Sequence, residues 1–179
     1  MNKYSIRFKV LAKLNDYEYR ISAKRKSEIE DYLILQTNLS LTEGKNYQTD
    51  EASICSINYY DKNKQRRRLK VYINSDSIQE TKELNDINQG NIDGYVCKVS
   101  EPRTTPLGRT ITEFVIAHNP EIEKGYSVYL PCIYFGKAMF KQGEKIKLYG
   151  KLQSRDYVNS MGESGRTYEF VTIHIGNDE

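Results

Sequence analysis

The sequence predicts an all-β protein that contains two tandem five-stranded barrels with short helical turns. Apolar and polar residues alternate with a period of two in one segment after another, as in strands that bury one face. Short clusters of turn residues separate these segments. A polar stretch at residues 79–93 then divides the strands into two sets. We therefore expect a degenerate N-terminal barrel at residues 1–78, a linker, and a C-terminal barrel at residues 94–179.

The first half contains five expected strands and one short helix or turn. In the first strand, Tyr4, Ile6 and Phe8 belong to an apolar face that alternates with polar residues. Strands are expected at residues 4–14, 17–23, 31–38, 53–60 and 67–74, and the helix or turn at residues 39–47. This order is that of the oligonucleotide/oligosaccharide-binding fold, the OB-fold.

A dense cationic cluster lies at the tip of the last hairpin of this half. It consists of Lys62, Lys64, Arg66, Arg67, Arg68 and Lys70, flanked by Tyr59, Tyr60 and Tyr72. OB-folds hold oligonucleotides with the loop between their fourth and fifth strands, and rings beside cations suit a single strand. We therefore predict that this hairpin contacts nucleic acid; a solvated hairpin tip is the alternative.

The second half repeats the same order of elements. Strands are expected at residues 94–99, 110–118, 126–135, 146–157 and 167–175, with a loop at residues 102–108 and a stub of a helix at residues 136–142. The halves are only weakly alike in sequence, so the order of the elements, and not detectable self-similarity, indicates the duplication.

One strand of the second half carries charges and rings on a single face. Its apolar face contains Ile146, Leu148, Gly150 and Leu152, and its other face Lys145, Lys147, Tyr149, Lys151, Gln153, Arg155 and Tyr157. Such a face offers cations to phosphates and flat rings to bases, as binding of single-stranded nucleic acid requires. An ordinary solvated strand face is the alternative explanation.

Three motifs in this half resemble the bacterial single-stranded DNA-binding protein family. LPCIYFGKAM is similar to the family's proline-containing strand that ends in an aromatic-Gly pair. KIKLYGKLQSRDY resembles its basic strand, and EPRTTPLGRTITEFVIAHN its opening hairpin. The resemblance covers residues 94–175 and is strongest to tandem OB-fold members from Firmicute chromosomes, plasmids and phages. Several motifs in the right order are more specific than any one of them.

The resemblance implies which residues bind nucleic acid. Tyr129 lies where the family often has a base-stacking Trp, Phe135 is the aromatic before Gly, and Tyr157 is the aromatic after the basic Arg. The phosphate contacts expected beside these rings are Arg155, Lys151, Lys147 and Lys145, with Arg103 and Arg109 in the first loop; Tyr149 shares their strand face. For any one ring, packing in the core is the alternative.

Two departures from the family point towards a protein of a plasmid or other mobile element. Housekeeping members end in an acidic tail that recruits replication and repair proteins, whereas this sequence ends in HIGNDE; a truncated sequence would explain that equally well. Housekeeping members also carry one OB-fold per chain, whereas two are expected here. A homodimer and replication proteins are the partners that follow from the resemblance, and a replication initiator that also binds duplex origin DNA is the alternative function.

Composition excludes few classes of function but agrees with a cytoplasmic protein. The net charge is only +3, three cysteines form no C-x-x-C pair, and no segment approaches 18 apolar residues. We expect no membrane partner, no cofactor and no metal site. The sequence contains no phosphate-binding loop and no zinc-binding histidine pair, and Cys132 is expected to face the core, so we do not expect an enzyme.

Two questions stay open at this point. Stacking and phosphate contacts serve DNA and RNA alike, so the sequence does not choose between them. OB-folds also bind proteins, so a scaffolding role competes with nucleic-acid binding, and the first half suits that role better than the second.

Overall fold

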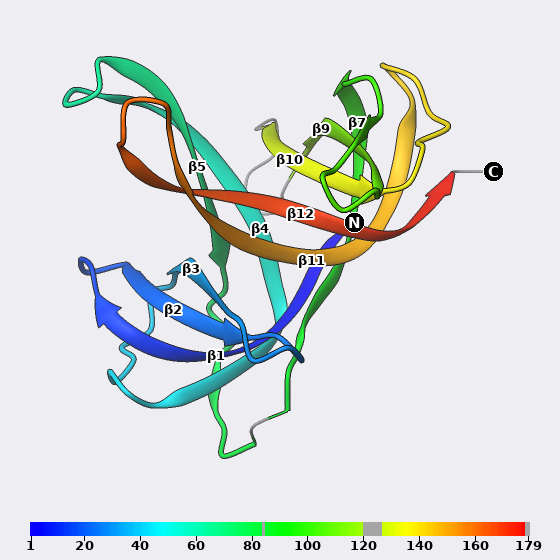
Figure 1. Cartoon of the computed structure of the whole chain (residues 1–179). Coiled ribbons are helices and arrows are strands. Elements are labelled where there is room, and N and C mark those ends of the chain that lie inside the picture. Colours follow the sequence, from blue (N-terminus) through cyan, green and yellow to red (C-terminus); the bar gives the residue numbers. More distant parts are fainter. Residues whose placement is uncertain (84, 120–126, 178–179) are drawn as a thin grey trace.

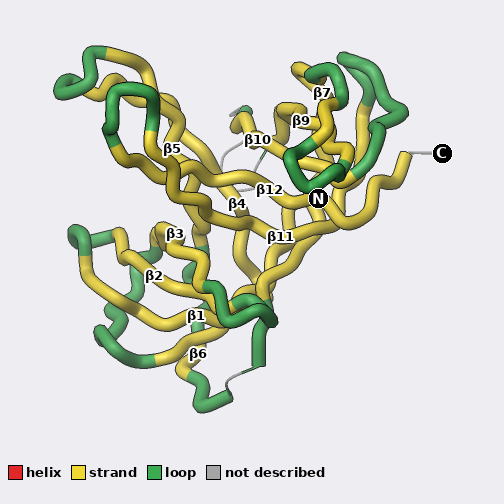
Figure 2. The backbone as a smooth tube through the Cα atoms, viewed as in Figure 1, coloured by secondary structure: helices red, strands yellow, loops and turns green. Residues whose placement is uncertain are grey.

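The computed structural model describes residues 1–83, 85–119 and 127–177, and every regular element in them is a strand (Figure 2). The strands are β1 (Asn2–Lys13), β2 (Glu18–Lys24), β3 (Glu30–Gln36), β4 (Asn46–Asp61), β5 (Arg66–Asn74), β6 (Gln79–Glu80), β7 (Asn88–Val99), β8 (Arg103–Thr104), β9 (Thr110–His118), β10 (Val128–Phe135), β11 (Lys145–Val158) and β12 (Ser164–Asn177). In these ranges no helix is long and apolar enough to cross a membrane.

The strands form two five-stranded barrels with the same connectivity (Figure 1). In the first, the order is β1-β2-β3-β5-β4, and β4 pairs with β1 to close the barrel. In the second, the order is β7-β9-β10-β12-β11, and β11 pairs with β7. Each barrel contains one parallel pair, β3–β5 or β10–β12. The tandem OB-fold architecture expected from the sequence is confirmed.

The alternation of apolar residues located the buried faces correctly in both halves. Tyr4, Ile6 and Phe8 are buried on the inner face of β1. Ile146, Leu148 and Leu152 of β11 are likewise buried, in one hydrophobic core that continues through both barrels. The period-two pattern succeeds here because each strand buries one face against the barrel interior and exposes the other.

The expected helical turns do not form in the described residues. Residues 39–45 make a turn that leads directly into β4, which begins at Asn46 and takes up the end of the expected helix. Residues 136–142 form a loop. Both helices are expected only because OB-folds often have a helix after their third strand. Neither segment has an apolar pattern with a period of 3.6, so the residues themselves do not favour a helix. The expected start of a strand at Tyr126 falls outside the described residues.

The expected linker also contains more strand than its polar composition indicated. Gln79–Glu80 forms β6, which pairs with β4, and residues 88–93 belong to β7. β7 pairs with β1 through Asn2–Ile6 before it enters the second barrel, so one antiparallel ladder joins the two halves. The division into residues 1–78, 79–93 and 94–179 stays a prediction.

An approximate twofold axis relates the two barrels. Asn2 in β1 donates a hydrogen bond through Nδ2 to the carbonyl oxygen of Ile54 at 2.9 Å. Asn88, the matching residue of β7, donates the same bond to the carbonyl oxygen of Leu152 at 3.0 Å. β1 and β7 also carry their bulges at matching positions, between Val10 and Ala12 and between Val96 and Lys98. The duplication is therefore clearer in hydrogen bonding than in sequence.

The axis passes through the pair Tyr4 and Gly90, which lie opposite each other in the β1–β7 ladder. Tyr4 is fully buried, and a Cβ atom on Gly90 would lie 2.5 Å from Tyr4 Cδ2. The Tyr4 hydroxyl donates to Asn88 Oδ1 and accepts a hydrogen bond from the amide of Leu152 at 2.6 Å. Burial raises the pKa of this hydroxyl far above its ordinary value. One side chain thus fills a position that two identical residues could not share.

Each barrel also extends one hairpin against the other barrel. In the first-half hairpin, Ser56 of β4 donates through Oγ to the carbonyl oxygen of Tyr129 at 2.7 Å and accepts from the amide of the same residue at 3.1 Å. In the second-half hairpin, Ser154 of β11 accepts a hydrogen bond through Oγ from the amide of Tyr32 at 2.8 Å. The two hairpins consequently lie beside each other and project the same way (Figure 1).

Candidate nucleic-acid interface

Two of the three rings expected to stack on bases lie exposed on one face of β10. Tyr129 is 44% exposed and Phe135 51% exposed. The β9–β10 ladder runs without a bulge between them, so both rings point away from the barrel interior. The two residues are six positions apart along the strand, which is about 20 Å. Neither ring is used in the core.

The third ring, Tyr157, lies at the far end of β11, where the β11–β12 hairpin leaves the barrel. It is paired across the hairpin with Gly165, and a Cβ atom on that glycine would lie 2.6 Å from Tyr157 Cζ. The ring is therefore packed on the hairpin backbone and half-buried. An aromatic ring over a cross-strand glycine is held in place by the sheet itself.

The cations predicted on β11 alternate with its buried residues, as expected. Lys145, Lys147 and Arg155 are exposed, and Lys151 is half-buried. Arg155 Nε lies 3.7 Å from Glu169 Oε1, a carboxylate on the neighbouring strand β12. Any phosphate that binds Arg155 must therefore compete with this carboxylate.

A second predicted phosphate contact is also paired. Arg103 donates through Nη2 to Glu113 Oε1 at 3.0 Å, and this hydrogen bond raises the pKa of the guanidinium above its ordinary value. Arg109 is exposed in the turn between β8 and β9. Both arginines thus lie between β7 and β9, in the first loop of the second barrel, and their contact with phosphate stays a prediction.

Tyr149 is held by two neighbours on the outer face of β11. Its hydroxyl donates to Gln89 Oε1 at 2.9 Å. Its ring stacks on the ring of His174 with centroids 6.1 Å apart and an interplanar angle of 25°. The ring belongs to the predicted face, but its position is fixed by contacts within the chain.

A groove of about 380 Å³ lies between the two projecting hairpins. It is lined by Arg66, Arg67, Arg68, Leu69, Val71, Pro131, Tyr157, Arg166, Thr167 and Tyr168. The basic hairpin of the first half and the aromatic end of β11 therefore face one common space. The sequence pointed to each of them separately but not to their juxtaposition.

The cations of the first-half hairpin are not equivalent. Arg68 Nη1 lies 3.2 Å from Asp61 Oδ2, and this hydrogen bond raises the pKa of Arg68, with a smaller contribution from Tyr59 and Tyr157. Lys64 is half-buried in the turn. Arg66 and Arg67 are exposed and form no ion pair with any described residue. These two guanidinium groups are consequently the most available in the groove.

Tyr72 does not join this groove. It lies on the outer face of β5, where Lys70 Nζ is 5.9 Å from the centre of its ring. Lys70 in turn forms an ion pair with Glu18 of β2. The structure therefore places Tyr72 and Lys70 in a contact within the first barrel, on the opposite strand face from Leu69 and Val71.

Sequence reasoning missed Arg166 and Tyr168, both of which line the groove. Arg166 donates to Asp156 Oδ1 at 2.8 Å, and this bond raises the pKa of Arg166. The alternation of polar and apolar residues in RTYEFV could have placed both residues on a strand. Only the position of the other hairpin shows that they face a groove.

The structure also places the potential metal ligands and the thiols of the described ranges. No group of three or more His, Cys, Asp and Glu residues is positioned to hold a metal ion there. Cys132 is buried, as expected, and burial raises its pKa well above the ordinary value. Burial also raises the pKa of Cys55 to about 12. Both thiols are thus protonated and inert at neutral pH.

Comparison with known proteins assigns the chain to a family. The model of the single-strand binding protein family matches residues 87–176, which is half of the chain and includes all of β7 to β11. The chain belongs to the single-strand binding protein family. The match covers the three motifs on which the resemblance in the sequence was based, and the strands that carry Tyr129, Phe135 and Tyr157.

Solved structures of a single-stranded DNA binding protein extend the likeness to both barrels. The wild-type single-stranded DNA binding protein from Thermus aquaticus superimposes with a TM-score of 0.72 at 10% identity, covering 99% of this chain and 93% of that one. A deletion mutant of the same protein gives a TM-score of 0.72 at 12% identity, with coverage of 100% and 95%. At these identities the likeness concerns the fold. A comparison with curated protein sequences gives no significant match.

Proposed function

We propose that this protein binds single-stranded DNA by stacking bases on exposed rings and neutralising phosphates with cations beside them. The observation that carries the proposal is the outer face of the second barrel, where Tyr129 and Phe135 are exposed on β10 while β11 presents alternating cations. Membership of the single-strand binding protein family supports it.

The geometry gives this binding two physical properties. A stacked base needs to offer only its flat face, so affinity depends little on sequence. Each neutralised phosphate releases counterions, so the logarithm of affinity falls with the logarithm of salt concentration with a slope of about −0.7 per contact. The groove between the hairpins continues the face, because Tyr157 and Pro131 line it together with Arg66 and Arg67.

We also propose a role in replication or maintenance of DNA, in a plasmid or other mobile element. Two OB-folds in one chain support this, because a homodimer of such chains would reach the four folds that housekeeping members assemble from four subunits. Replication proteins are the partners that this role requires. A role in binding rather than in catalysis is part of the same proposal.

A replication initiator that also binds duplex origin DNA is the second candidate. The observation that favours it is the pair of exposed arginines, Arg66 and Arg67, at the end of a projecting hairpin. Competition between origin duplex and random duplex of equal length tests it. Preference for the origin supports initiation, and equal competition contradicts it.

Titration with a labelled thymidine oligomer at two salt concentrations tests the main proposal. We expect micromolar or tighter binding that weakens at the higher salt concentration. Competition with the matching uridine oligomer then shows whether DNA is preferred to RNA. Absence of binding at low salt would contradict the proposal and favour a scaffolding role for the two barrels.

A further inference from the structure

The duplicated architecture allows each position of the binding face to be compared with its counterpart in the first barrel. Tyr95 lies opposite Lys145 in the β7–β11 ladder as Lys9 lies opposite Asn46 in the β1–β4 ladder. The β1–β4 ladder has a bulge between Tyr4 and Ile6. Beyond it, the hydrogen bond from Asn2 to Ile54 matches the hydrogen bond from Asn88 to Leu152. The two ladders therefore define which residue of β4 corresponds to each residue of β11.

None of the cations on β11 has a cationic counterpart. Lys145, Lys147, Lys151 and Arg155 correspond to Asn46, Gln48, Ser53 and Ile57. The terminal ring is kept, because Tyr157 corresponds to Tyr59. The first barrel thus has the strand that would carry phosphate contacts but lacks the charges.

The residue of the first barrel that corresponds to Tyr129 is Tyr32 in β3, and another part of the chain covers its ring. The correspondence follows because the backbone of each tyrosine is hydrogen-bonded to the serine of the opposite hairpin. The guanidinium of Arg166 lies 4.7 Å from the centre of the Tyr32 ring, and the Tyr32 hydroxyl donates to Glu30 Oε2 at 3.2 Å. A base that stacked on Tyr32 would have to displace a cation that already occupies the ring face.

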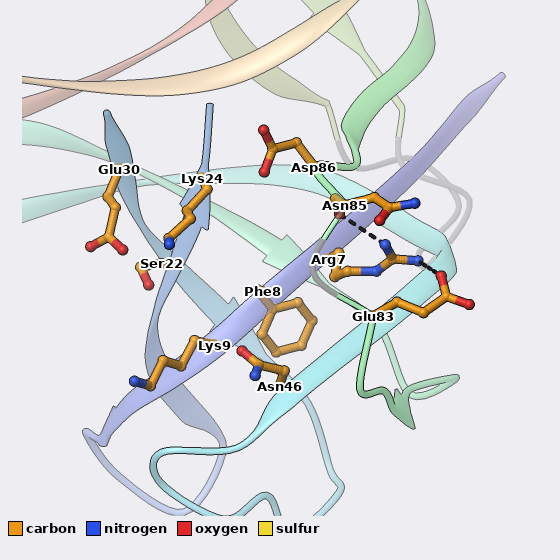
Figure 3. Close-up of a pocket in the computed structure, with 10 residues that line it drawn as sticks. All are labelled: Arg7, Phe8, Lys9, Ser22, Lys24, Glu30, Asn46, Glu83, Asn85 and Asp86. Carbon is orange, nitrogen blue, oxygen red and sulfur yellow. Dashed lines mark hydrogen bonds and ion pairs between the residues drawn. The ribbon is translucent and has the colours of Figure 1, made fainter. Parts of the chain in front are cut away.

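The segment between the barrels occupies another part of the same face (Figure 3). Arg7 of β1 donates through Nη1 to the carbonyl oxygen of Asn85 at 2.8 Å and pairs through Nη2 with Glu83 at 2.7 Å. Glu83 and Asp86 therefore border a hollow that Lys9 also lines. The cations Arg7, Lys9 and Lys24 are balanced there by Glu30, Glu83 and Asp86, so the hollow offers a phosphate backbone no net positive charge.

We infer that each chain holds one single strand, on the outer face of the second barrel, and that the first barrel's equivalent face binds none. The first barrel contributes its β4–β5 hairpin, which forms one wall of the groove beside Tyr157. The inference rests on the proposed function and adds to it the number of strands per chain and the asymmetry between the halves.

The stoichiometry of a short oligomer provides the first test. An oligomer of about eight thymidines fits within the roughly 4–16 nucleotides that one OB-fold covers. Isothermal titration at low salt is expected to give one oligomer per chain. Two oligomers per chain would overturn the inference while leaving the proposed function intact. No binding would overturn the proposed function and the inference with it.

Matched substitutions in the two halves provide the second test. We expect Lys151→Ala with Arg155→Ala to weaken binding about tenfold and to reduce the salt slope by roughly 1.4, which is two contacts. The counterpart pair, Ser53→Ala with Ile57→Ala, removes no charge and is expected to change affinity by less than about twofold. Circular dichroism and melting temperature establish that both variants fold.

A third pair of variants compares the two corresponding rings. We expect Tyr129→Ala to weaken binding of the oligomer at least about fivefold, because it removes a stacking surface. We expect Tyr32→Ala to change affinity by less than about twofold, because Arg166 already covers that ring. Equal losses of affinity on Tyr32→Ala and Tyr129→Ala, in variants that melt at the wild-type temperature, would overturn it.

Discussion

Strands β4 and β11 occupy the same place in their barrels, and they share an apolar inner face but differ on their outer face. Their inward residues are alike in chemistry: Ile54 and Leu152 are both completely buried. Their outward residues differ, since Ile57 stands in β4 where Arg155 stands in β11. The inner face decides whether the barrel packs, and the outer face decides what the barrel can bind. A duplicated fold can therefore lose one function on one side without losing its architecture.

The largest expected effect comes from the rings of the second barrel. Replacing Tyr129, Phe135 and Tyr157 together by alanine removes up to three stacking surfaces, each worth about 1–3 kcal/mol. We expect affinity for a thymidine oligomer to fall by at least about 100-fold in fluorescence anisotropy. The control is Tyr59→Ala in the first barrel, the counterpart of Tyr157, which should cost less than the triple replacement. Unchanged affinity in the triple variant would show that the strand binds elsewhere.

The axis residues allow a sharper comparison of the two halves. Gly90→Ala would place a Cβ atom 2.4 Å from the carbonyl oxygen of Lys3, in the ladder that joins the barrels. We expect a loss of about 3 kcal/mol in the free energy of unfolding, at the upper end of the range for overpacking. Gly176→Ala is the matched control, because its nearest contact would be an ordinary 3.8 Å. Equal stability of the two variants would contradict the tight packing on the axis.

A third prediction concerns a titratable group that only the second barrel carries. His118 is buried, and burial lowers its pKa from 6.5 to about 4. Its Nδ1 lies 3.3 Å from Asn2 Nδ2, while its Nε2 has no partner among the described residues. Between these two pKa values the unfolded chain binds a proton that the folded chain does not. The imidazole therefore destabilises the fold progressively as the pH falls from about 6.5 to about 4.

The shift corresponds to roughly 3 kcal/mol, at about 1.4 kcal/mol per pKa unit. Urea denaturation at a series of pH values should show this loss in the wild type. His118→Gln should remove the part of the pH dependence that lies between about 5 and 6.5, where carboxylates contribute less. An identical pH profile in both proteins would show that His118 does not titrate with a lowered pKa.

The smallest expected effect comes from breaking the ion pair between Glu169 on β12 and Arg155 on β11. Glu169→Gln removes the carboxylate beside Arg155 and leaves that guanidinium to a phosphate. Because an ion pair at the surface is worth about 0.2–1 kcal/mol, affinity for the oligomer should rise by a factor between about 1.4 and 5 at low salt. Glu163→Gln in the turn of the same hairpin is the control and should change little. A decrease in affinity would indicate that Glu169 orders the face rather than competing with the strand.

The sequence was sufficient to predict the strands and their buried faces, but not the groove that the two hairpins form together. Alternation located the buried face of β11 and the exposed cations on it, because that signal is contained within one strand. The groove depends on where the hairpin with Arg67 ends relative to Tyr157, and no local pattern encodes a distance between two hairpins. The pairing of Arg155 with Glu169 depends on the register of β11 and β12. Long-range placement, not strand propensity, is thus what the sequence left undetermined.

The pair on the axis, Tyr4 and Gly90, has a consequence for how such a chain can be divided. Two identical subunits meeting on a true twofold would bring either two tyrosines or two glycines to that point. The first would collide and the second would leave a hole where the ring now sits. The two halves are therefore complementary at this point, and neither could be replaced by a second copy of the other.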